Sequence, residues 1–500
     1  MNRALKRISI AILAMFLLLL INVNYLQGFE TTSLASRPFN IRAVSADNQY
    51  QRGDIQTADG VKIAGTTPSN DIYKYVRTYA NGPVYAPVTG YDSIYSSTGV
   101  EHAEDALLSG TGSQLAFRNF IDMITNKPQK GATVQVTINS KAQQAAYQGL
   151  QNVLQGTGRV GGVVALNPST GAILAMASYP SYNPSKLATH NGTALNAYDE
   201  QLLRQKPSPL LNNATQTTLP PGSTFKIVTS SAWFAQAATR NPNSMVDSPQ
   251  VLTLPQTTNK LHNDNNEVCG NAGATGQTTI LWAFSQSCDT TFGKLGMDLG
   301  GGALKNQADA FGMNANLSIP GVTVAPSQYV TPPSLPLTAF SAIGQFSDTV
   351  TPLQEAMFSA AIANGGTLMS PYLIQQVTAS DLSVVNSTQP KQLSQAVSPA
   401  VANNVKQMMV AVTQQPQGTA FAFNANNVGG IVIAGKTGTA QNALNGASPN
   451  PDAVFTAFAP ADNPKIAVGV ILQGAGYGAQ AAAPVAVAVI KAYLATLGIR

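Results

Sequence analysis

The N-terminus carries one apolar stretch that decides where the rest of this chain can fold. Residues 8–26 contain no charged side chain, and residues 8–21 are apolar except for one serine. A run of this length can span a bilayer with a mild tilt. Three basic residues precede it, and the positive-inside rule keeps such residues in the cytoplasm. We therefore predict a short cytoplasmic tail and a single transmembrane anchor over residues 1–28, with the chain after Phe29 exported.

A secreted, soluble protein is the alternative to an anchored one. The triplet Ser33-Leu34-Ala35 resembles the small-x-small site at which signal peptides are cleaved. It lies too far beyond the apolar run to fit that pattern, which favours an uncleaved anchor. We expect no second hydrophobic stretch of spanning length. The sequence therefore predicts a single-pass protein of the cell membrane whose remaining domains are extracytoplasmic.

Composition narrows the class of the exported part. The 500 residues are 44% hydrophobic and 10% charged, which is enough apolar material for two or three packed domains. The net charge of +5 is small for this length, and no run of Lys or Arg follows the N-terminus. These features argue against a nucleic-acid-binding protein. Neither a metal nor a disulfide is needed to explain folding.

Patterning divides the exported part into two units. Residues 29–152 are rich in turn-forming residues with short β-branched runs, which is typical of an irregular β-containing module. Residues 153–500 open with a hairpin pattern, Gly162–Leu166 and its partner at 172–176, and helical patterns follow it. This predicts an α+β domain in which helices pack on an antiparallel sheet. Further strands are expected at residues 430–434, 453–458 and 466–472, and a closing helix at 483–497.

A serine and a lysine lie one helical turn apart where a Pro-Pro-Gly turn opens an apolar helix. Ser223 and Lys226 then share a face of this helix. Free N–H groups and the positive dipole end at a helix N-terminus favour a developing oxyanion. A buried lysine can deprotonate such a serine, which removes the need for histidine. The alternative, common by chance, is an N-cap serine with an exposed lysine.

Two further motifs make this combination specific. Ser287-Cys288-Asp289 follows later in the chain, and Lys436-Thr437-Gly438-Thr439 comes after the strand predicted at residues 430–434. A cation and a hydroxyl at a strand end can bind a carboxylate, and a glycine lets the backbone lie against a substrate peptide. Each motif alone could be a chance match or a β-turn. Their order and local contexts together indicate one active site.

With these motifs in place, the chain resembles the class B penicillin-binding proteins of the PbpA type over nearly all of its length. Residues 52–55 match the Arg-Gly-x-Ile signature found just outside the membrane, and residues 99–101 match the pedestal motif. The resemblance implies a pedestal over residues 29–152. It also implies a penicillin-recognising serine transpeptidase domain over residues 153–500, with an antiparallel sheet flanked by helices and an all-α subdomain. Shorter matching segments are residues 344–345, 351–354, 363–366, 418–420 and 458–461.

The resemblance also implies catalytic roles. Ser223 would attack the carbonyl of a D-Ala-D-Ala stem peptide and release the terminal D-alanine. Lys226 would be the general base, and Ser287 would relay a proton to the leaving amine. The acyl group would then pass to an amine of a neighbouring stem peptide of the peptidoglycan. β-Lactam antibiotics would acylate the same serine, no metal or organic cofactor is implied, and a membrane-embedded glycan polymerase would be the partner protein.

Substrate-binding roles follow from the same resemblance. Lys436 and Thr437 would hold the donor carboxylate, and Gly438 would let the peptide lie along the strand. The N–H group of Thr439 would complete an oxyanion hole with that of the nucleophilic serine. Asp289 would contact the acyl amide of the substrate.

Asp289 is the one departure from the family pattern that reaches the chemistry. The family usually has asparagine there, which donates a hydrogen bond, whereas an ionised carboxylate can only accept. The carboxylate would stabilise the ammonium form of Lys226 and repel the incoming donor carboxylate, so we expect impaired acylation. Departures that leave the chemistry untouched are Asn139, Asn213 and Phe346.

Other enzymes and one non-enzyme function remain open. In a serine β-lactamase or a D,D-carboxypeptidase, water rather than an amine would accept the acyl group, and the three motifs cannot separate these from a transpeptidase. The anchor and the segment at residues 52–55 favour the transpeptidase. A penicillin-binding sensor or scaffold would act through partners with little turnover. A Ser-His-Asp enzyme is not expected, because the three histidines lie in loop-like segments without a Gly-x-Ser-x-Gly elbow.

The two cysteines of the chain, Cys269 and Cys288, both lie on the exported side. A bridge between them would close a loop of about twenty residues, which contributes roughly 3 kcal/mol in the chain-entropy description. It would also pin the segment that bears Ser287. The alternative is a buried thiol at Cys288 and an unrelated one at Cys269. We favour the disulfide, because exported proteins fold in oxidising surroundings.

Overall fold

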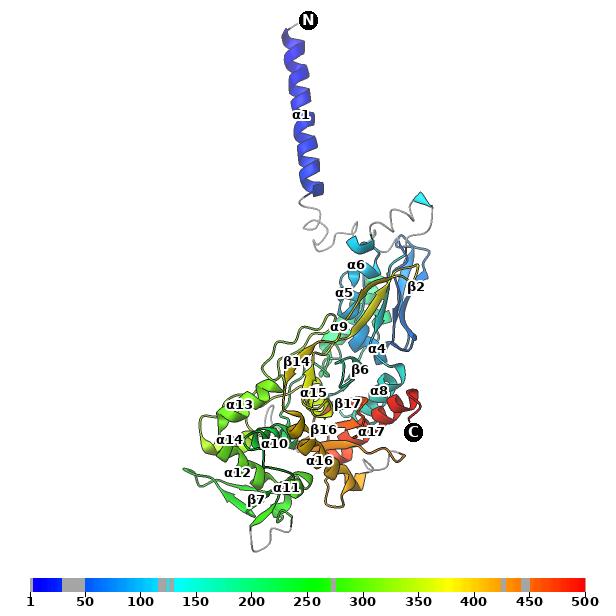
Figure 1. The fold of residues 1–500 in the computed structure, drawn as a ribbon. Coiled ribbons are helices and arrows are strands. Elements are labelled where there is room, and N and C mark those ends of the chain that lie inside the picture. Colours follow the sequence, from blue (N-terminus) through cyan, green and yellow to red (C-terminus); the bar gives the residue numbers. More distant parts are fainter. Residues whose placement is uncertain are drawn as a thin grey trace.

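The computed structural model shows a β-rich unit next to a larger unit of helices and strands (Figure 1). It describes residues 3–28, 50–115, 124–125, 130–270, 276–423, 429–441 and 450–499. The larger unit carries all three motifs. The smaller unit carries the segments at residues 52–55 and 99–101.

The N-terminal helix α1, Arg3–Gly28, is present as predicted. Its apolar segment Leu5–Leu26 has a mean hydropathy of 2.2 and is 0% buried against the rest of the chain. Such an exposed apolar surface is consistent with a single membrane anchor or a signal sequence. A second helix, α17, Gly478–Thr496, is also long and apolar enough to span, with a mean hydropathy of 1.4, which corrects the expectation of only one such stretch. It is 61% buried and packs on a sheet, so it is a core helix.

The sheet of the smaller unit has six strands in the order β13-β12-β4-β1-β2-β3. Strands β12 and β13 come from far along the chain, after the larger unit has begun. Strand β12 pairs antiparallel with β4, so a late hairpin completes this early sheet. The sequence pattern did not predict this crossover. The bounds are β1 Ile55–Gln56, β2 Lys62–Pro68, β3 Tyr75–Tyr79, β4 Thr133–Val136, β12 Ile374–Thr378 and β13 Val384–Ser387.

Two sequence motifs of the smaller unit meet in a buried ion cluster. Nε of Arg52 lies 2.9 Å from Oε2 of Glu101, and Nε of Arg77 lies 2.6 Å from Oε1 of the same carboxylate. Burial opposes ionisation of Glu101, yet the two arginines hold its pKa below the ordinary value. The cluster links the segment at residues 52–55 to helix α5, Gly99–Ala103. Because removal of one partner would leave a buried charge unpaired, the two motifs depend on each other.

The larger unit is built on a five-stranded antiparallel sheet in the order β15-β16-β17-β5-β6. Every residue of β16 and β17 is buried, so both faces of the sheet are covered. Helices α8 and α17 pack together on this sheet, and α15 packs on β17, β5 and β16. The predicted hairpin and the two later strands are confirmed. The bounds are β5 Gly161–Leu166, β6 Ile173–Tyr179, β15 Ala434–Ala440, β16 Asp452–Ala459, β17 Ile466–Leu472, α8 Ser140–Leu154 and α15 Pro352–Ala363.

The edge strand β15 differs from the prediction. We expected a strand at residues 430–434 with the Lys-Thr-Gly motif after it, but β15 begins at Ala434 and includes the motif. The reason is its pairing with β16, in which Lys436 lies opposite Thr456 and Thr439 opposite Ala453. This pairing overrides the weak strand propensity of glycine and lysine. The motif therefore forms one rigid edge of the central sheet.

The remaining elements are helices, which lie in both units, and short hairpins. Helix α10, Lys226–Ala235, packs against α12, α13 and α16. The other helices are α4 Gly82–Thr89, α6 Asp105–Leu108, α9 Gly192–Arg204, α11 Ile280–Ser285, α12 Asp289–Leu299, α13 Gly301–Ala310, α14 Leu335–Ser341 and α16 Pro399–Gln414. The short strands are β7 Met245–Asp247, β8 Val251–Thr253, β9 Lys260–His262, β10 Gln277–Thr279, β11 Thr367–Met369 and β14 Gln392–Gln395.

Candidate active site

Ser223 lies on a tight turn rather than on the first turn of an α-helix. A 3₁₀ turn, η3, spans Gly222–Phe225, and α10 begins at Lys226. Gly222 has φ of +55°, and a Cβ there would lie 2.9 Å from the carbonyl oxygen of Thr439. Only glycine therefore lets the turn lie this close to β15. The predicted closeness of the serine and the lysine is present, because Nζ of Lys226 lies 2.9 Å from Oγ of Ser223.

Lys226 is fully buried and lies at the centre of a polar cluster. Its Nζ donates to Oγ of Ser223, to the carbonyl oxygen of Ser287 at 2.7 Å and to Oδ1 of Asp289 at 2.5 Å. A side chain with 0% exposure cannot exchange these partners for water. The first and second motifs thus meet at one nitrogen atom.

Ser287 joins the second motif to the third. Its Oγ lies 3.2 Å from Nζ of Lys226 and 2.8 Å from Nζ of Lys436. The Ser287 backbone has φ of +64°, a conformation that residues with a side chain rarely adopt. This strained backbone places the hydroxyl of Ser287 between the two lysines. Sequence reasoning named Ser287 but had no signal for its backbone conformation.

Lys436 is a buried cation near another cation. Its Nζ also donates to the carbonyl oxygen of Thr437 at 2.9 Å. Burial first, and then the charge of Lys226, lower the pKa of Lys436 well below its ordinary value. Asp289 and Asp264 act against this shift, and a negatively charged group that arrives here would act in the same direction.

Two residues outside the three motifs support the edge strand. Oγ1 of Thr419 lies 2.6 Å from Oγ1 of Thr437, and Nε2 of Gln345 donates to the carbonyl oxygen of Thr439 at 3.0 Å. Both lie in segments that the family resemblance had marked, at residues 344–345 and 418–420, but no pattern in the sequence assigned them to the site. Gly438 is required because a Cβ there would lie 2.7 Å from the carbonyl oxygen of Pro221.

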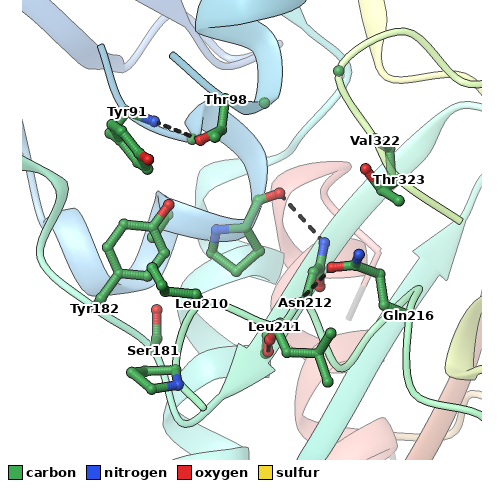
Figure 2. Close-up of a pocket in the computed structure, with 17 residues that line it drawn as sticks. Tyr91, Thr98, Ser181, Tyr182, Leu210, Leu211, Asn212, Gln216, Val322 and Thr323 are labelled. Carbon is green, nitrogen blue, oxygen red and sulfur yellow. Dashed lines mark hydrogen bonds between the residues drawn. The ribbon is translucent and has the colours of Figure 1, made fainter. Parts of the chain in front are cut away.

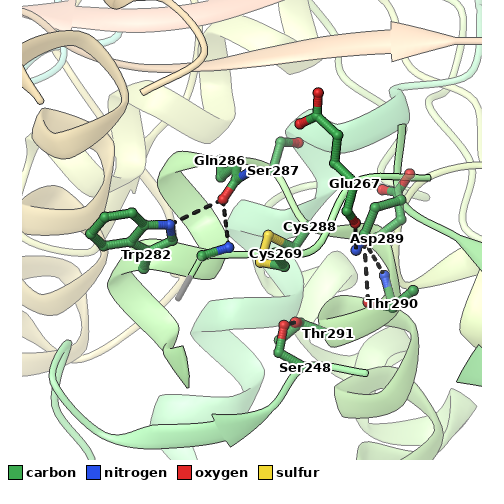
Figure 3. The surroundings of a disulfide bond; sticks show 12 residues. Ser248, Glu267, Cys269, Trp282, Gln286, Ser287, Cys288, Asp289, Thr290 and Thr291 are labelled. Carbon is green, nitrogen blue, oxygen red and sulfur yellow. Dashed lines mark hydrogen bonds between the residues drawn. A yellow bond between two sulfur atoms is a disulfide. The ribbon is translucent and has the colours of Figure 1, made fainter. Parts of the chain in front are cut away.

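Cys269 and Cys288 are joined by a disulfide, with their Cα atoms 5.8 Å apart (Figure 3). Cys288 lies between Ser287 and Asp289 in sequence, so the bridge anchors the segment that contacts both lysines. Oε1 of Gln286 accepts from Nε1 of Trp282 at 3.0 Å and from the N–H group of Gly270 at 2.7 Å, which adds a second link between the same two segments.

Asp289 opens helix α12 and forms the ion pair with Lys226. Its side chain is 21% exposed, so it faces the surface side of the cluster. A second carboxyl, Asp264, is near the same lysines. Burial first, and then the charge of Asp289, raise the pKa of Asp264. The mouth of the cluster is therefore more acidic than the motifs alone predict.

A cavity of about 280 Å³ lies elsewhere, where the smaller and larger units meet (Figure 2). Tyr91 and Thr98 line it from the smaller unit, and Tyr182, Asn212 and Gln216 line it from the larger one. Its lining includes no charged residue and no residue of the three active-site motifs, although it does include Gly99 of the pedestal motif. The active site is therefore defined by the side-chain cluster and not by this cavity.

A serine paired with a lysine, beside a Lys-Thr-Gly edge strand, is the arrangement of the penicillin-recognising serine enzymes. The chain belongs to the penicillin-binding protein transpeptidase family. Residues 161–491 match the family described as penicillin binding protein transpeptidase domain, and residues 52–134 match the penicillin binding protein A dimerisation domain.

Relatives extend this likeness over the full length. The chain is 40% identical to peptidoglycan D,D-transpeptidase PbpA of Mycolicibacterium smegmatis, over 99% of both chains. It is 38% identical to PbpA of Mycobacterium tuberculosis, again over 99% of both. The ceftriaxone acyl-enzyme complex of penicillin-binding protein A from M. tuberculosis covers 90% of this chain and is itself covered completely, with 36% identity and a TM-score of 0.84. The predicted fold class and the resemblance to class B proteins of the PbpA type are confirmed.

Proposed function

We propose that this protein is a peptidoglycan D,D-transpeptidase that forms an acyl-enzyme at Ser223 with stem peptides and with β-lactams. Relatives named for this activity match the chain end to end, and the similar solved structures include acyl-enzyme complexes with ceftriaxone, imipenem and penicillin G. The observation that carries the proposal is the 2.9 Å contact between Nζ of the buried Lys226 and Oγ of Ser223. It provides a nucleophile with a base and needs no histidine.

Acylation uses the cluster as follows. Lys226 in its neutral form accepts the proton of Ser223, whose Oγ forms a bond to the carbonyl carbon of the D-Ala-D-Ala amide. The N–H groups of Ser223 and Thr439 stabilise the oxyanion. The proton then passes through Oγ of Ser287 to the leaving D-alanine amine as the amide bond breaks. The position of Ser287 between two lysines supports this relay.

The donor carboxylate binds at the third motif. Lys436 and Thr437 offer a cation and a hydroxyl side by side on β15, and Gly438 keeps the backbone open to the peptide. A carboxylate would counter the burial and the neighbouring charge that lower the pKa of Lys436, and so favour its ammonium form. An amine of a second stem peptide then attacks the ester and regenerates Ser223.

The N-terminal region positions this chemistry outside the cell. We propose that residues 1–28 are a retained anchor, residues 29–152 a pedestal and residues 153–500 the catalytic domain. The exposed apolar surface of α1 supports the anchor. Family analogy supports a membrane-embedded glycan polymerase as the partner. N-terminal sequencing of the protein from washed membranes tests this, because a chain starting after residue 28 would mean a cleaved signal sequence.

Labelling with a fluorescent penicillin tests the proposed nucleophile. The parent protein should form a covalent adduct, and Ser223→Ala should form none while remaining folded, because only the nucleophile is lost. Ser230→Ala is the matched control, since Ser230 is a fully buried serine on helix α10, which follows the turn that carries Ser223. An adduct that persists in Ser223→Ala would contradict the assignment.

Product analysis separates the remaining enzyme functions. With a D-Ala-D-Ala peptide and an added amine acceptor, a transpeptidase yields the acceptor adduct, whereas a carboxypeptidase yields only the hydrolysed peptide. A β-lactamase would release hydrolysed penicillin with turnover. A scaffold would give neither product, and that result would contradict the proposal.

A further inference from the structure

A carboxyl group that has no cationic partner in the part of the chain that the structure describes lies beneath the turn that carries Ser223. Glu355, on helix α15, is 0% exposed. Its Oε1 lies 2.7 Å from Oγ1 of Thr224, the residue that follows the nucleophile. Its Oε2 has no hydrogen-bond partner among the described residues. The three sequence motifs assign no role to this residue.

The hydrogen bonds around Thr224 identify the form of this carboxyl. Oγ1 of Thr224 also lies 2.8 Å from the carbonyl oxygen of Pro221. A threonine hydroxyl has one hydrogen and a carbonyl oxygen can only accept, so both contacts are hydrogen bonds only if the hydroxyl donates to Pro221. The contact between Thr224 and Glu355 then needs a donor on the other side. A carboxyl group donates only when it is protonated.

The surroundings of Glu355 favour that neutral form. Burial raises the pKa of Glu355 from 4.5 to about 8, and the contact with Thr224 is the one influence that acts against this rise. No charged group on the described elements packed around it opposes this shift. On the neighbouring strands, the hydroxyl of Thr456 donates to the backbone oxygen of Glu355. Gly469 has no side chain, which leaves room for the Cβ of Glu355.

We propose that Glu355 is a positioning residue for acylation, and that its protonated carboxyl holds the turn bearing Ser223 against β15 through Thr224. The carbonyl group of Pro221, fixed by Thr224, is the group against which Gly438 packs at the close approach described above. A displaced turn would therefore move the Ser223 N–H group relative to that of Thr439. This inference rests on the proposed function, because it concerns the rate of Ser223 acylation.

Ionisation of Glu355 would reverse the chain of hydrogen bonds. A carboxylate can only accept, so Thr224 would turn its hydrogen from Pro221 toward Glu355. The turn would lose the bond between Thr224 and the carbonyl group of Pro221, which lies against Gly438 of β15, and acylation would slow as pH rises through about 8. Lys436 also titrates, so the ratio of parent to variant is the informative quantity.

The experiment compares the second-order acylation constants of the parent, Glu355→Gln and Glu355→Leu with benzylpenicillin from about pH 6 to about pH 10. Glutamine keeps a donor and does not titrate, so it should match the parent near pH 7 and exceed it progressively above pH 8. Leucine has no donor, so it should be about tenfold slower near pH 7 with no added alkaline loss. A parent-to-glutamine ratio that is constant with pH would overturn the proposal.

Two further variants keep the test decisive. Asp348→Asn is the matched control, because Asp348 is another buried carboxyl whose pKa burial raises to about 8, but it bonds to Ser341 and not to the turn. It should leave the alkaline decline unchanged, and an equal shift would overturn the proposal. Thr224→Val removes the link itself and should abolish the difference between Glu355 and glutamine at this position. A difference that persists would also overturn it.

A measurement that does not depend on acylation tests this inference separately from the proposed function. The infrared difference spectrum of the parent minus Glu355→Gln should show the C=O stretch of a protonated carboxyl at neutral pH and lose it as pH rises through about 8, because the band of Asp348 cancels in the difference. A parent that shows this band but forms no adduct would overturn the proposed function alone. A parent that is acylated but lacks the Glu355 band at neutral pH would overturn this inference alone.

Discussion

Replacement of Asp289 by asparagine should make the enzyme faster. Oδ1 of Asp289 lies 2.5 Å from Nζ of Lys226, and Lys226 has no exposure to water. An ionised carboxylate at this distance stabilises the ammonium form, which has no lone pair with which to accept the Ser223 proton. Asparagine would keep the polar contact and remove the charge. The charge that favours the ammonium form would then be gone.

The size of the effect follows from the charge that is removed. With an effective dielectric constant of about 20, two unit charges about 4 Å apart attract by about 4 kcal/mol. Hydrogen bonds to charged groups contribute about 1.5–3 kcal/mol net, which is a smaller value. We use this smaller value for the pair, because the side chain of Asp289 is 21% exposed and water screens its charge. Because each 1.36 kcal/mol is a factor of ten, Asp289→Asn should be about 10- to 100-fold faster near neutral pH.

The assay is the second-order acylation constant of both proteins with benzylpenicillin near neutral pH, followed by intact-protein mass. Asp264→Asn is the control, since Asp264 feels the charges of Lys226 and Lys436 without a hydrogen bond to either. It should give a much smaller gain. A parent at least as fast as Asp289→Asn would refute the reasoning and show that the carboxylate is a functional substitute.

Three further predictions follow from the same geometry. Lys226→Ala should abolish the penicillin adduct, whereas Lys436→Ala should mainly raise the apparent KM for a carboxylate-bearing substrate. If both variants lost kcat equally and kept the KM of the parent, these separate roles of the two lysines would be contradicted. Thiol labelling of the denatured, unreduced protein should find no free thiol, and two thiols per chain would refute the bridge between Cys269 and Cys288. Burial raises the pKa of Glu355 from 4.5 to about 8, so between these pH values the folded state binds more protons than the unfolded state. The free energy of unfolding therefore falls as pH rises through that window, by up to about 5 kcal/mol. Glutamine does not titrate, so the free energy of unfolding of Glu355→Gln minus that of the parent should increase from about pH 5 to about pH 8 in urea titrations. A difference that stays constant with pH would contradict this prediction.

Local sequence was sufficient for the features that depend on short-range geometry. The spacing of Ser223 and Lys226 places them one turn apart on either a 3₁₀ turn or an α-helix, so their contact could be predicted without the fold. The hairpin of β5 and β6 was predicted because strand pattern and turn residues lie next to each other in the chain. The apolar run of α1 needed only its length.

Contacts between distant segments could not be predicted in this way. The meeting of Ser287 with Lys436 joins residues 149 positions apart, and nothing in either motif specifies the other. Strand β12 joins the smaller sheet because β4 offers it a pairing edge, but alternation within a strand does not say which edge it will meet. The bounds of β15 were missed for the same reason, since its pairing with β16 and not its composition makes it a strand.

The ion pair at Lys226 links the stability of the site to its reactivity. A fully buried ammonium group is costly unless a counter-charge is near, and Asp289 supplies that charge. The same charge withholds the lone pair that acylation needs. Asp289→Asn should therefore lower the free energy of unfolding by about 1–3 kcal/mol while it speeds acylation. Opposite changes in these two quantities are expected only if the carboxylate acts through the charge of Lys226, because a merely structural loss would lower both.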